Sequence, residues 1–182
     1  MAPVPAPTKP VAAPIPATAP AATKPAPTPA PKPASPSADR IAAVEAIAKP
    51  STGDAGEDEY SYGYRLWEAK FFPEAQQQLT RYVQGYPKHK RISFARNLLG
   101  RAYLDDNKPG TAAQWFLQNY QADKQGERAA DSLLYLGVAM AKLKETKRAC
   151  VAFAEFRNVY PTEAAGRLKA QLDAATKAVT CN

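Results

Sequence analysis

Apolar residues recur at helical spacing from residue 58 onward, and their pattern repeats with a period of 37 residues. Glycine, alanine and large apolar side chains return in the same order in three successive copies. Five columns coincide: Gly63, Gly100 and Gly137; Ala75, Ala112 and Ala149; Leu79, Phe116 and Phe153; Tyr62, Leu99 and Leu136; Leu66, Tyr103 and Met140. A period of this length is typical of stacked supersecondary units.

Each copy predicts two helices. The first carries the glycine, which lets a neighbouring helix approach closely, and the second carries the alanine with a large apolar residue four positions later on the same face. Breaks at Phe72-Pro73, at Lys108-Pro109-Gly110 and at Glu145-Thr146 separate the two helices of each copy. We therefore expect an all-α array of three helix pairs, over about residues 56–92, 93–129 and 130–166.

One more helix is predicted after the third copy, over about residues 163–179. Thr162 is suited to cap its start, and Leu168 and Leu172 fall on one face. A single final helix is what a stacked array needs to cover its last open face. We expect a domain over residues 58–182 that ends in this capping helix.

The segment before the repeats has a different composition. Of the 18 prolines, 13 fall within residues 1–38, which contain no acid and no aromatic residue. Such a segment cannot bury enough apolar area to offset the entropy of ordering it, so we predict a disordered Pro/Ala-rich linker. Residues 39–57 follow as a short helix or linker, with Ile41, Val44 and Ile47 spaced by three.

Charge does not point to a nucleic-acid partner. The chain has 24 Lys and Arg against 17 Asp and Glu, a formal net charge of +7, and its only dense basic run is residues 88–91. Nucleic-acid binders concentrate positive charge on one face beside stacking aromatics. Because the run directly follows Tyr86-Pro87, we interpret it as a solvated connector. The composition also excludes a membrane span.

The repeat resembles the tetratricopeptide repeat, in which glycine, alanine, a large apolar residue and proline follow at intervals of 12, 4 and 8. Two copies match it throughout: Gly63, Ala75, Leu79 and Pro87; and Gly137, Ala149, Phe153 and Pro161. The middle copy departs, with Lys124 where proline is expected. The tryptophan usual near the start of such repeats is missing from all three copies.

A 37-residue interval with Tyr-Pro endings is similar to the C-terminal repeat domain of the Tol-Pal system cell division coordinator family. The stretches that carry this similarity are Tyr60–Tyr64, Asn97–Tyr103, and Ala149-Cys150 with a terminal Cys181. The resemblance implies a right-handed superhelical array and a non-enzymatic periplasmic scaffold. It also implies envelope partners, namely the inner-membrane Tol energy-transducing protein and a peptidoglycan synthase. Such a scaffold coordinates envelope constriction with peptidoglycan synthesis at cell division.

Members of that family begin with a signal peptide and a trimeric coiled coil, which a low-complexity linker joins to the repeats. No signal peptide is visible here, because a proline at every second or third position prevents an apolar core. We expect a chain that begins within the linker, is monomeric and belongs in the periplasm. The alternative is a structural assembly component of another envelope or secretion complex, in which the repeats pack permanently.

Superposition of the repeats places Cys150 and Cys181 at neighbouring helix ends. Cys150 lies early in the second helix of copy three, and Cys181 stands three repeat units after Lys70, at the end of a first helix. Antiparallel neighbours bring one helix's end beside the other's start, so the two sulfurs could meet. We favour a disulfide in an oxidising periplasm, whereas two free thiols are the alternative for a cytoplasmic protein.

The first helices of such an array line a partner-binding groove. Its predicted wall is rich in aromatic residues: Tyr60, Tyr64, Trp67, Phe94, Asn97, Arg101 and Leu104. In copy three the matching positions are Asp131, Leu134, Val138 and Lys142. This wall suits a peptide or helix with apolar anchors and an acid. The alternative is that Trp67 and Phe94 pack against the preceding linker or an adjacent helix.

No motif supports catalysis. His89 is the only histidine and stands among three cations, and the pair Asp105-Asp106 falls at a predicted helix end, where we interpret it as part of a turn. A glycine-rich phosphate loop, a nucleophile motif and a metal-spaced cluster are all missing. We therefore predict a protein that is not an enzyme, with no catalytic residue, no metal site and no cofactor.

Overall fold

The computed structural model describes residues 37–181, and every regular element in that range is a helix. Its helices pack in consecutive pairs, so the predicted all-α array is confirmed. The predicted disordered linker over residues 1–38 lies outside the described residues, apart from its last two positions.

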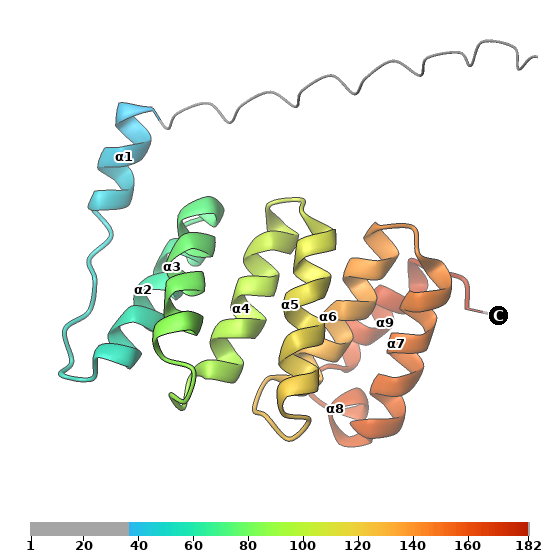
Figure 1. Ribbon diagram of the computed structural model, residues 1–182. Coiled ribbons are helices and arrows are strands. Elements are labelled where there is room, and N and C mark those ends of the chain that lie inside the picture. The colour runs from blue at the N-terminus through green and yellow to red at the C-terminus, as the bar shows by residue number, and fades with distance from the viewer. Residues whose placement is uncertain (1–36, 182) are drawn as a thin grey trace, which may run out of the picture. The chain divides into compact units, whose positions relative to one another are not determined.

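Six helices of 14 residues each run side by side in chain order (Figure 1). The pairs are α2 (Ala55–Glu68) with α3 (Phe72–Gly85), α4 (Ile92–Asp105) with α5 (Pro109–Ala122), and α6 (Ala129–Lys142) with α7 (Thr146–Val159). The first helices begin at residues 55, 92 and 129, and the second helices begin at 72, 109 and 146. Both series keep the 37-residue period of the sequence.

The turn inside each pair is also repeated. One residue with positive φ follows each first helix: Lys70 (64°), Asn107 (55°) and Lys144 (63°). At the first turn, the N–H of Phe71 donates to the Leu66 carbonyl and the N–H of Lys70 donates to the Trp67 carbonyl, both at 2.9 Å. These are the two bonds of a Schellman cap. The cap reverses the chain within three residues and so sets the antiparallel pairing.

Close packing within each pair depends on the glycine column. The facing residues are Gly63 with Leu79, Gly100 with Phe116 and Gly137 with Phe153. A Cβ atom at Gly137 would lie 2.3 Å from Cε1 of Phe153, closer than any carbon contact allows. The large side chain therefore packs directly on the backbone of the first helix. Both Phe116 and Phe153 are fully buried there.

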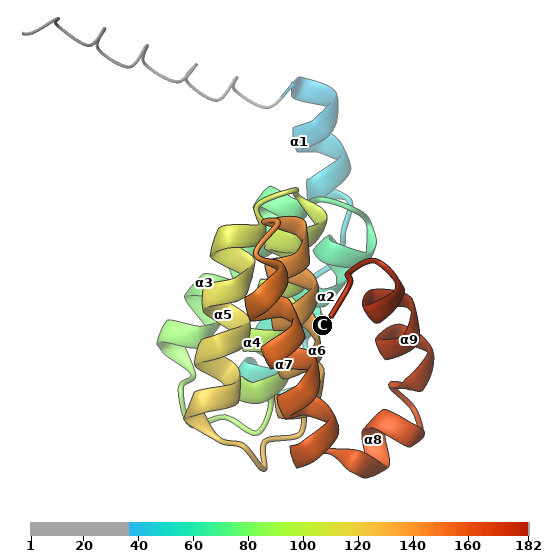
Figure 2. The same ribbon diagram turned by 90° about the vertical axis from the view of Figure 1, so that its right-hand side faces the viewer.

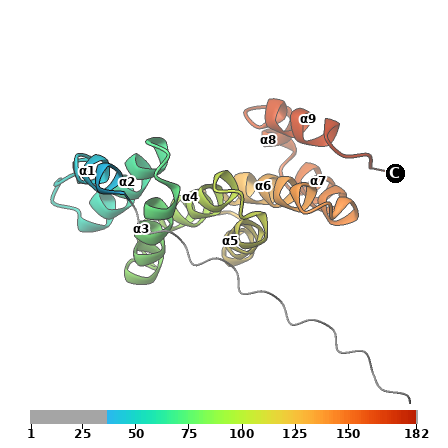
Figure 3. The ribbon, with the colours of Figure 1, turned by 90° about the horizontal axis from the view of Figure 1, so that it is seen from above.

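The second helices and the C-terminal helices cover different sides of the first helices. Viewed along the helices, α3 and α5 lie on one side of α4 and α6, and the two C-terminal helices lie on the other (Figure 3). The first helices α2, α4 and α6 also contact one another in sequence. Side chains from different copies therefore meet along this row.

The predicted capping helix over about 163–179 is divided into α8 (Pro161–Ala165) and α9 (Lys169–Lys177). The break falls at Gly166, which leaves the helical conformation with φ −107° and ψ −121°, and glycine is among the weakest helix formers. Figure 2 shows α8 turning the chain so that α9 runs back alongside α6 and α7. Leu168 and Leu172 anchor it, because both are buried in the core that α5, α6 and α7 share.

The segment before the repeats forms α1 (Ala38–Glu45). Val44 and Ile47 pack against the cluster around Leu66, whereas Ile41 is 48% exposed, so only two of the three predicted apolar positions are covered. Arg40 donates to both carboxylate oxygens of Glu74 on α3, at 2.8 and 2.7 Å. This ion pair and the apolar contacts of Val44 and Ile47 help to hold the segment against the first repeat.

Candidate interaction face

The side chain of Arg101 links three first helices. Its guanidinium carbon lies 4.5 Å from the centre of the Trp67 ring on α2 and 5.2 Å from the centre of the Tyr135 ring on α6. Each such contact is worth about 0.5–2 kcal/mol. Within residues 37–181, Arg101 forms no ion pair with a carboxylate. The two rings therefore hold the guanidinium without neutralising it.

Tyr64 and Trp67 extend this arrangement along α2. Tyr64 is 40% exposed, and its ring centre lies 5.8 Å from that of Trp67. The indole Nε1 of Trp67 donates to Asp105 at the end of α4, at 2.8 Å, which fixes the orientation of the indole. We call Tyr64, Trp67, Arg101 and Tyr135 the aromatic–arginine face.

Phe94 lies between two guanidinium groups. The Arg91 and Arg128 Cζ atoms stand 5.0 and 4.8 Å from its ring centre. Arg91 Nε donates to both oxygens of Glu57 at 3.0 Å, and Arg128 donates to Asp131 at 3.2 Å. The bond from Arg91 lowers the pKa of Glu57. Both cations are thus paired within the chain, and the Phe94 ring, 6.2 Å from that of Tyr60 on α2, packs beside the arginines that precede α4 and α6.

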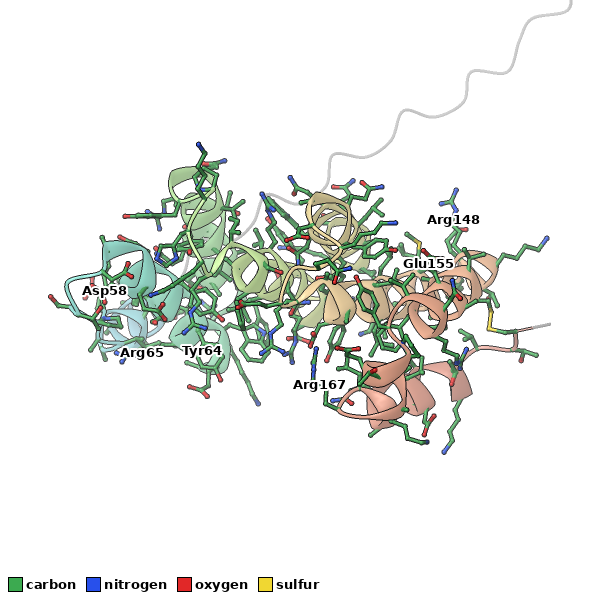
Figure 4. The ribbon with its side chains drawn as sticks, turned by 90° about the horizontal axis from the view of Figure 1, so that it is seen from below. Asp58, Tyr64, Arg65, Arg148, Glu155 and Arg167 are labelled. Atoms are coloured by element: carbon green, nitrogen blue, oxygen red, sulfur yellow. A yellow bond between two sulfur atoms is a disulfide. The ribbon has the colours of Figure 1, made fainter. Side chains whose placement is uncertain are left out.

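Asp131 on α6 also connects the repeats to the C-terminal helices. Its carboxylate accepts two hydrogen bonds from Arg167, at 2.9 and 2.7 Å, in a bidentate pair. Arg167 belongs to the segment between α8 and α9 and lies beside α6 (Figure 4). Asp131, predicted to line a groove, is therefore a buried link of which only 7% is exposed.

Two other predicted groove residues are covered. Asn97 and Leu104 on α4 are 6% and 5% exposed. Asn97 Nδ2 donates to Ser132 Oγ of α6 at 3.0 Å, and Leu104 belongs to the core. Tyr60 is half-buried, with its ring 6.0 Å from that of Tyr82, and burial raises its pKa. Asn97 and Leu104 are buried because α4 lies between the first and third helix pairs. Side chains of α4 that point along the row of helices therefore contact the adjacent pair.

One residue of the basic run at 88–91, His89, packs against its neighbours in the fold. His89, predicted in a solvated connector, has a side chain only 17% exposed. Its Nδ1 lies 2.7 Å from the Tyr82 hydroxyl and accepts the N–H of Arg91 at 3.2 Å. Since a backbone N–H can only donate, Nε2 carries the proton and donates to Asp54 at 3.1 Å. The connector is thus joined to the start of α2.

Asp54 is the N-cap of α2 and collects several donors. Its carboxylate accepts the backbone N–H of Glu57 at 3.0 Å and Lys90 Nζ at 3.2 Å. These bonds, the first above all, lower the pKa of Asp54 to about 2. Lys90 also lies 3.7 Å from a Glu57 oxygen. Lys90 and Arg91 of this run therefore pair with acids at the start of α2.

The two cysteines are joined. The Sγ atoms of Cys150 and Cys181 lie 1.97 Å apart, with their Cα atoms 5.6 Å apart. The disulfide ties α7 to the segment that follows α9. Its two cysteines stand 31 residues apart in the sequence, and the bond closes the C-terminal helices onto the last repeat.

Sequence reasoning missed Tyr135 and the acceptor role of Asp105. Tyr135 stands 37 residues after Leu98, a buried residue of the core. Its place in the repeat therefore predicts a core residue instead of one on the interaction face. Asp105 does end α4, as the turn interpretation expects, and it additionally accepts the Trp67 indole N–H. A large aromatic residue in a column of smaller residues was the signal that could have found Tyr135.

Residues 37–181 contain no group of three or more His, Cys, Asp or Glu side chains placed to hold a metal ion. None of the helices there is both long and apolar enough to cross a bilayer. No protein-family model matches the chain, and a search of curated proteins finds no match. Any indication of function therefore comes from the surfaces of the chain itself.

Proposed function

We propose that this protein is a non-enzymatic scaffold that binds a segment of a partner protein on its aromatic–arginine face. The observation that carries the proposal is Arg101, which is held between two rings and has no carboxylate partner in residues 37–181. A side chain already ordered in this way loses little conformational entropy when it binds. Arginine, tryptophan and tyrosine are also the residues that dominate binding energy at interfaces.

The chemistry of the face defines the partner. Arg101 favours a carboxylate, and Tyr64, which is 40% exposed, offers an apolar surface beside it. A peptide or helix that carries an acid next to an apolar side chain matches both. Packed glycines hold the helix pairs and a disulfide holds the C-terminal segment on α7, so binding requires little reorganisation of the scaffold.

We propose further that the scaffold acts in the periplasm, within the Tol-Pal system. The resemblance of the repeats supports this assignment, and the Cys150–Cys181 disulfide supports an oxidising compartment. The proposed partners are the inner-membrane Tol energy-transducing protein and a peptidoglycan synthase. Binding them would coordinate envelope constriction with peptidoglycan synthesis at cell division.

Isothermal titration with the purified periplasmic part of each partner tests the proposal. Arg101→Ala removes the cation and is expected to weaken binding by about tenfold or more, as for a central interface residue. Tyr64→Ala combined with Arg101→Ala is expected to weaken it further. Arg81→Ala, on the exposed surface of α3, is the matched control. Wild-type affinity in the Arg101→Ala variant would contradict the aromatic–arginine face as the binding site.

The alternative is a structural component of another envelope or secretion complex, in which the repeats pack permanently. Light scattering separates the two functions, because a recruiter stays monomeric alone whereas an assembly component forms stable oligomers. A stable oligomer of the wild type, together with no heat from either partner, would favour the alternative.

A further inference from the structure

A second surface lies on the side of the second helices. A hollow with a volume of about 330 Å³ opens between α5, α6 and α7. Its apolar wall comes from one residue of α5, three of α6 and two of α7: Leu117, Leu133, Leu136, Met140, Val151 and Ala152. Val151 is 69% exposed and Leu117 38% exposed. We call this hollow the α5–α7 pocket.

The pocket exists because one large side chain is missing from the repeat pattern. Ala152 stands 37 residues after Trp115, which is at the same position of α5. Trp115 packs against the cluster that contains Val83 and Leu99. The residues one period after these two, Tyr120 and Leu136, line the pocket. An indole thus fills the equivalent space in the preceding repeat, and alanine leaves it open here.

The rim of the pocket is positively charged. Lys147 and Arg148 line it, and the Arg148 side chain is 71% exposed and extends away from α7 (Figure 4). Its nearest acid is Glu145, at the 4.0 Å limit of an ion pair. The rim acid Glu155 accepts the Tyr120 hydroxyl at 3.0 Å and keeps its charge, so the lining carries two cations against one acid. The rim therefore favours an acidic neighbour for whatever enters the pocket.

We propose that the α5–α7 pocket binds an aromatic side chain, an indole above all, of a partner polypeptide whose neighbouring acid pairs with Lys147 or Arg148. Because Trp115 fills the equivalent space one repeat earlier, an indole is the side chain that fits the pocket. Because the rim is basic, the residues next to that indole should be acidic. Residues 1–38 of this chain cannot supply the anchor, because they contain neither an aromatic residue nor an acid. A buried aromatic ring with an adjacent charge pair is a strong anchor at interfaces.

This pocket is separate from the aromatic–arginine face. Figure 4 places Tyr64 near one end of the row of helices and Arg148 and Glu155 near the other. The proposal stands on its own residues and does not rest on the proposed function.

A synthetic peptide with the sequence acetyl-Asp-Glu-Trp-Leu-Asp-amide is the probe, with binding measured by isothermal titration. Wild type is expected to bind it. Peptides in which alanine replaces the tryptophan, or lysine replaces the acids, are expected to bind about tenfold or more weakly. The decisive variant is Ala152→Trp, which places an indole of the chain itself in the hollow, as Trp115 does one repeat earlier. It is expected to lose binding about tenfold or more.

Several outcomes would overturn the proposal. One is that the wild-type protein gives no detectable heat with the peptide. Another is that an Ala152→Trp variant, folded as judged by circular dichroism and its thermal transition, binds the peptide as tightly as the wild type. If that variant unfolds, Lys147→Glu with Arg148→Glu decides, with Arg157→Glu on the exposed surface of α7 as control. Equal affinity in the double variant and the control overturns the proposal, and loss in the double variant alone supports it.

Two measurements distinguish peptide binding in the pocket from binding at the aromatic–arginine face and from dimer formation. The peptide carries an acid beside an apolar residue, which the aromatic–arginine face also favours, so Arg101→Ala is measured beside Ala152→Trp. Affinity lost only in Ala152→Trp supports the pocket, whereas affinity lost only in Arg101→Ala overturns the proposal, so failure here and failure of the proposed function are distinguishable. A dimer in light scattering that Ala152→Trp dissociates would assign the pocket to a second copy of the chain and overturn the peptide proposal.

Discussion

Asn97 Nδ2 donates a hydrogen bond of 3.0 Å to Ser132 Oγ, and this bond joins α4 to α6 inside the array. The same hydroxyl accepts Asn119 Nδ2 of α5 at 2.9 Å. Ser132 is fully buried, so two amide donors meet one acceptor away from water. Three helices of two successive repeats are held in register by this one side chain.

Ser132→Ala is expected to lower the free energy of unfolding by about 1–3 kcal/mol, because it leaves a buried amide of Asn97 without its acceptor. Urea denaturation measures the loss. Combining it with Asn97→Leu removes the unpaired donor, and leucine stands in the same column one repeat later at Leu134. The double variant should therefore lose less than the single one. Wild-type stability in Ser132→Ala would contradict the proposed role of the bond.

Gly137→Ala is expected to destabilise the fold by about 1–3 kcal/mol, because the added Cβ overpacks the core. The new atom would lie 2.3 Å from Cε1 of Phe153, which is fully buried. Gly110→Ala is the matched control, since a Cβ there meets nothing within 4 Å. The control should be neutral or slightly stabilising. Equal thermal transitions for the two variants would show that the glycine column is not needed for packing.

Loss of the disulfide is expected to cost about 3–4 kcal/mol in the chain-entropy model, because Cys150 and Cys181 are separated by 31 residues. Cys181→Ser, or reduction of the wild type, should show this as a lower thermal transition. Amide exchange should become faster around Leu172 in α9 and stay unchanged in α2 and α3. Uniformly faster exchange would mean that the disulfide stabilises the whole array.

Asp54 is expected to make the stability of the fold depend on pH in the acidic range. Its pKa in the fold is lowered to about 2, mainly by the backbone N–H of Glu57. A group with a lowered pKa contributes fully above its unfolded value of about 3.9 and loses its contribution as the pH falls towards 2. Asp54→Asn keeps a cap without the charge, so its melting temperature should fall less between about pH 4.5 and 2. Parallel curves for variant and wild type would contradict this.

Much of the fold could be predicted because helix formation and helix pairing are local and periodic. The 37-residue columns indicate which residues face each other within a pair, and Gly137 does lie against Phe153 as its column suggests. The break at Gly166 was missed because Leu168 and Leu172 keep helical spacing beyond it. A pattern of apolar positions does not show where a chain must turn to bring them onto a neighbour.

The candidate site was only partly predictable. Tyr64 and Arg101 were identified from their place on the first helices, but Asn97 was expected at the surface and is 6% exposed. The covering group, Ser132, comes from the next repeat, 35 residues away. The exposure of a side chain depends on the residues that pack around it, and for Asn97 these come from the stacking of one repeat on the next.

The sequence by itself determined the helices, their pairing and the positions of small residues between them. The reason is that these features depend on the spacing and size of residues within one repeat. Only the tertiary structure decided which polar side chains are free. It places Arg101 between two rings, pairs His89 with Asp54, and opens a hollow at Ala152 where Trp115 fills its counterpart. Each depends on side chains from different repeats meeting in space, which periodicity alone does not specify.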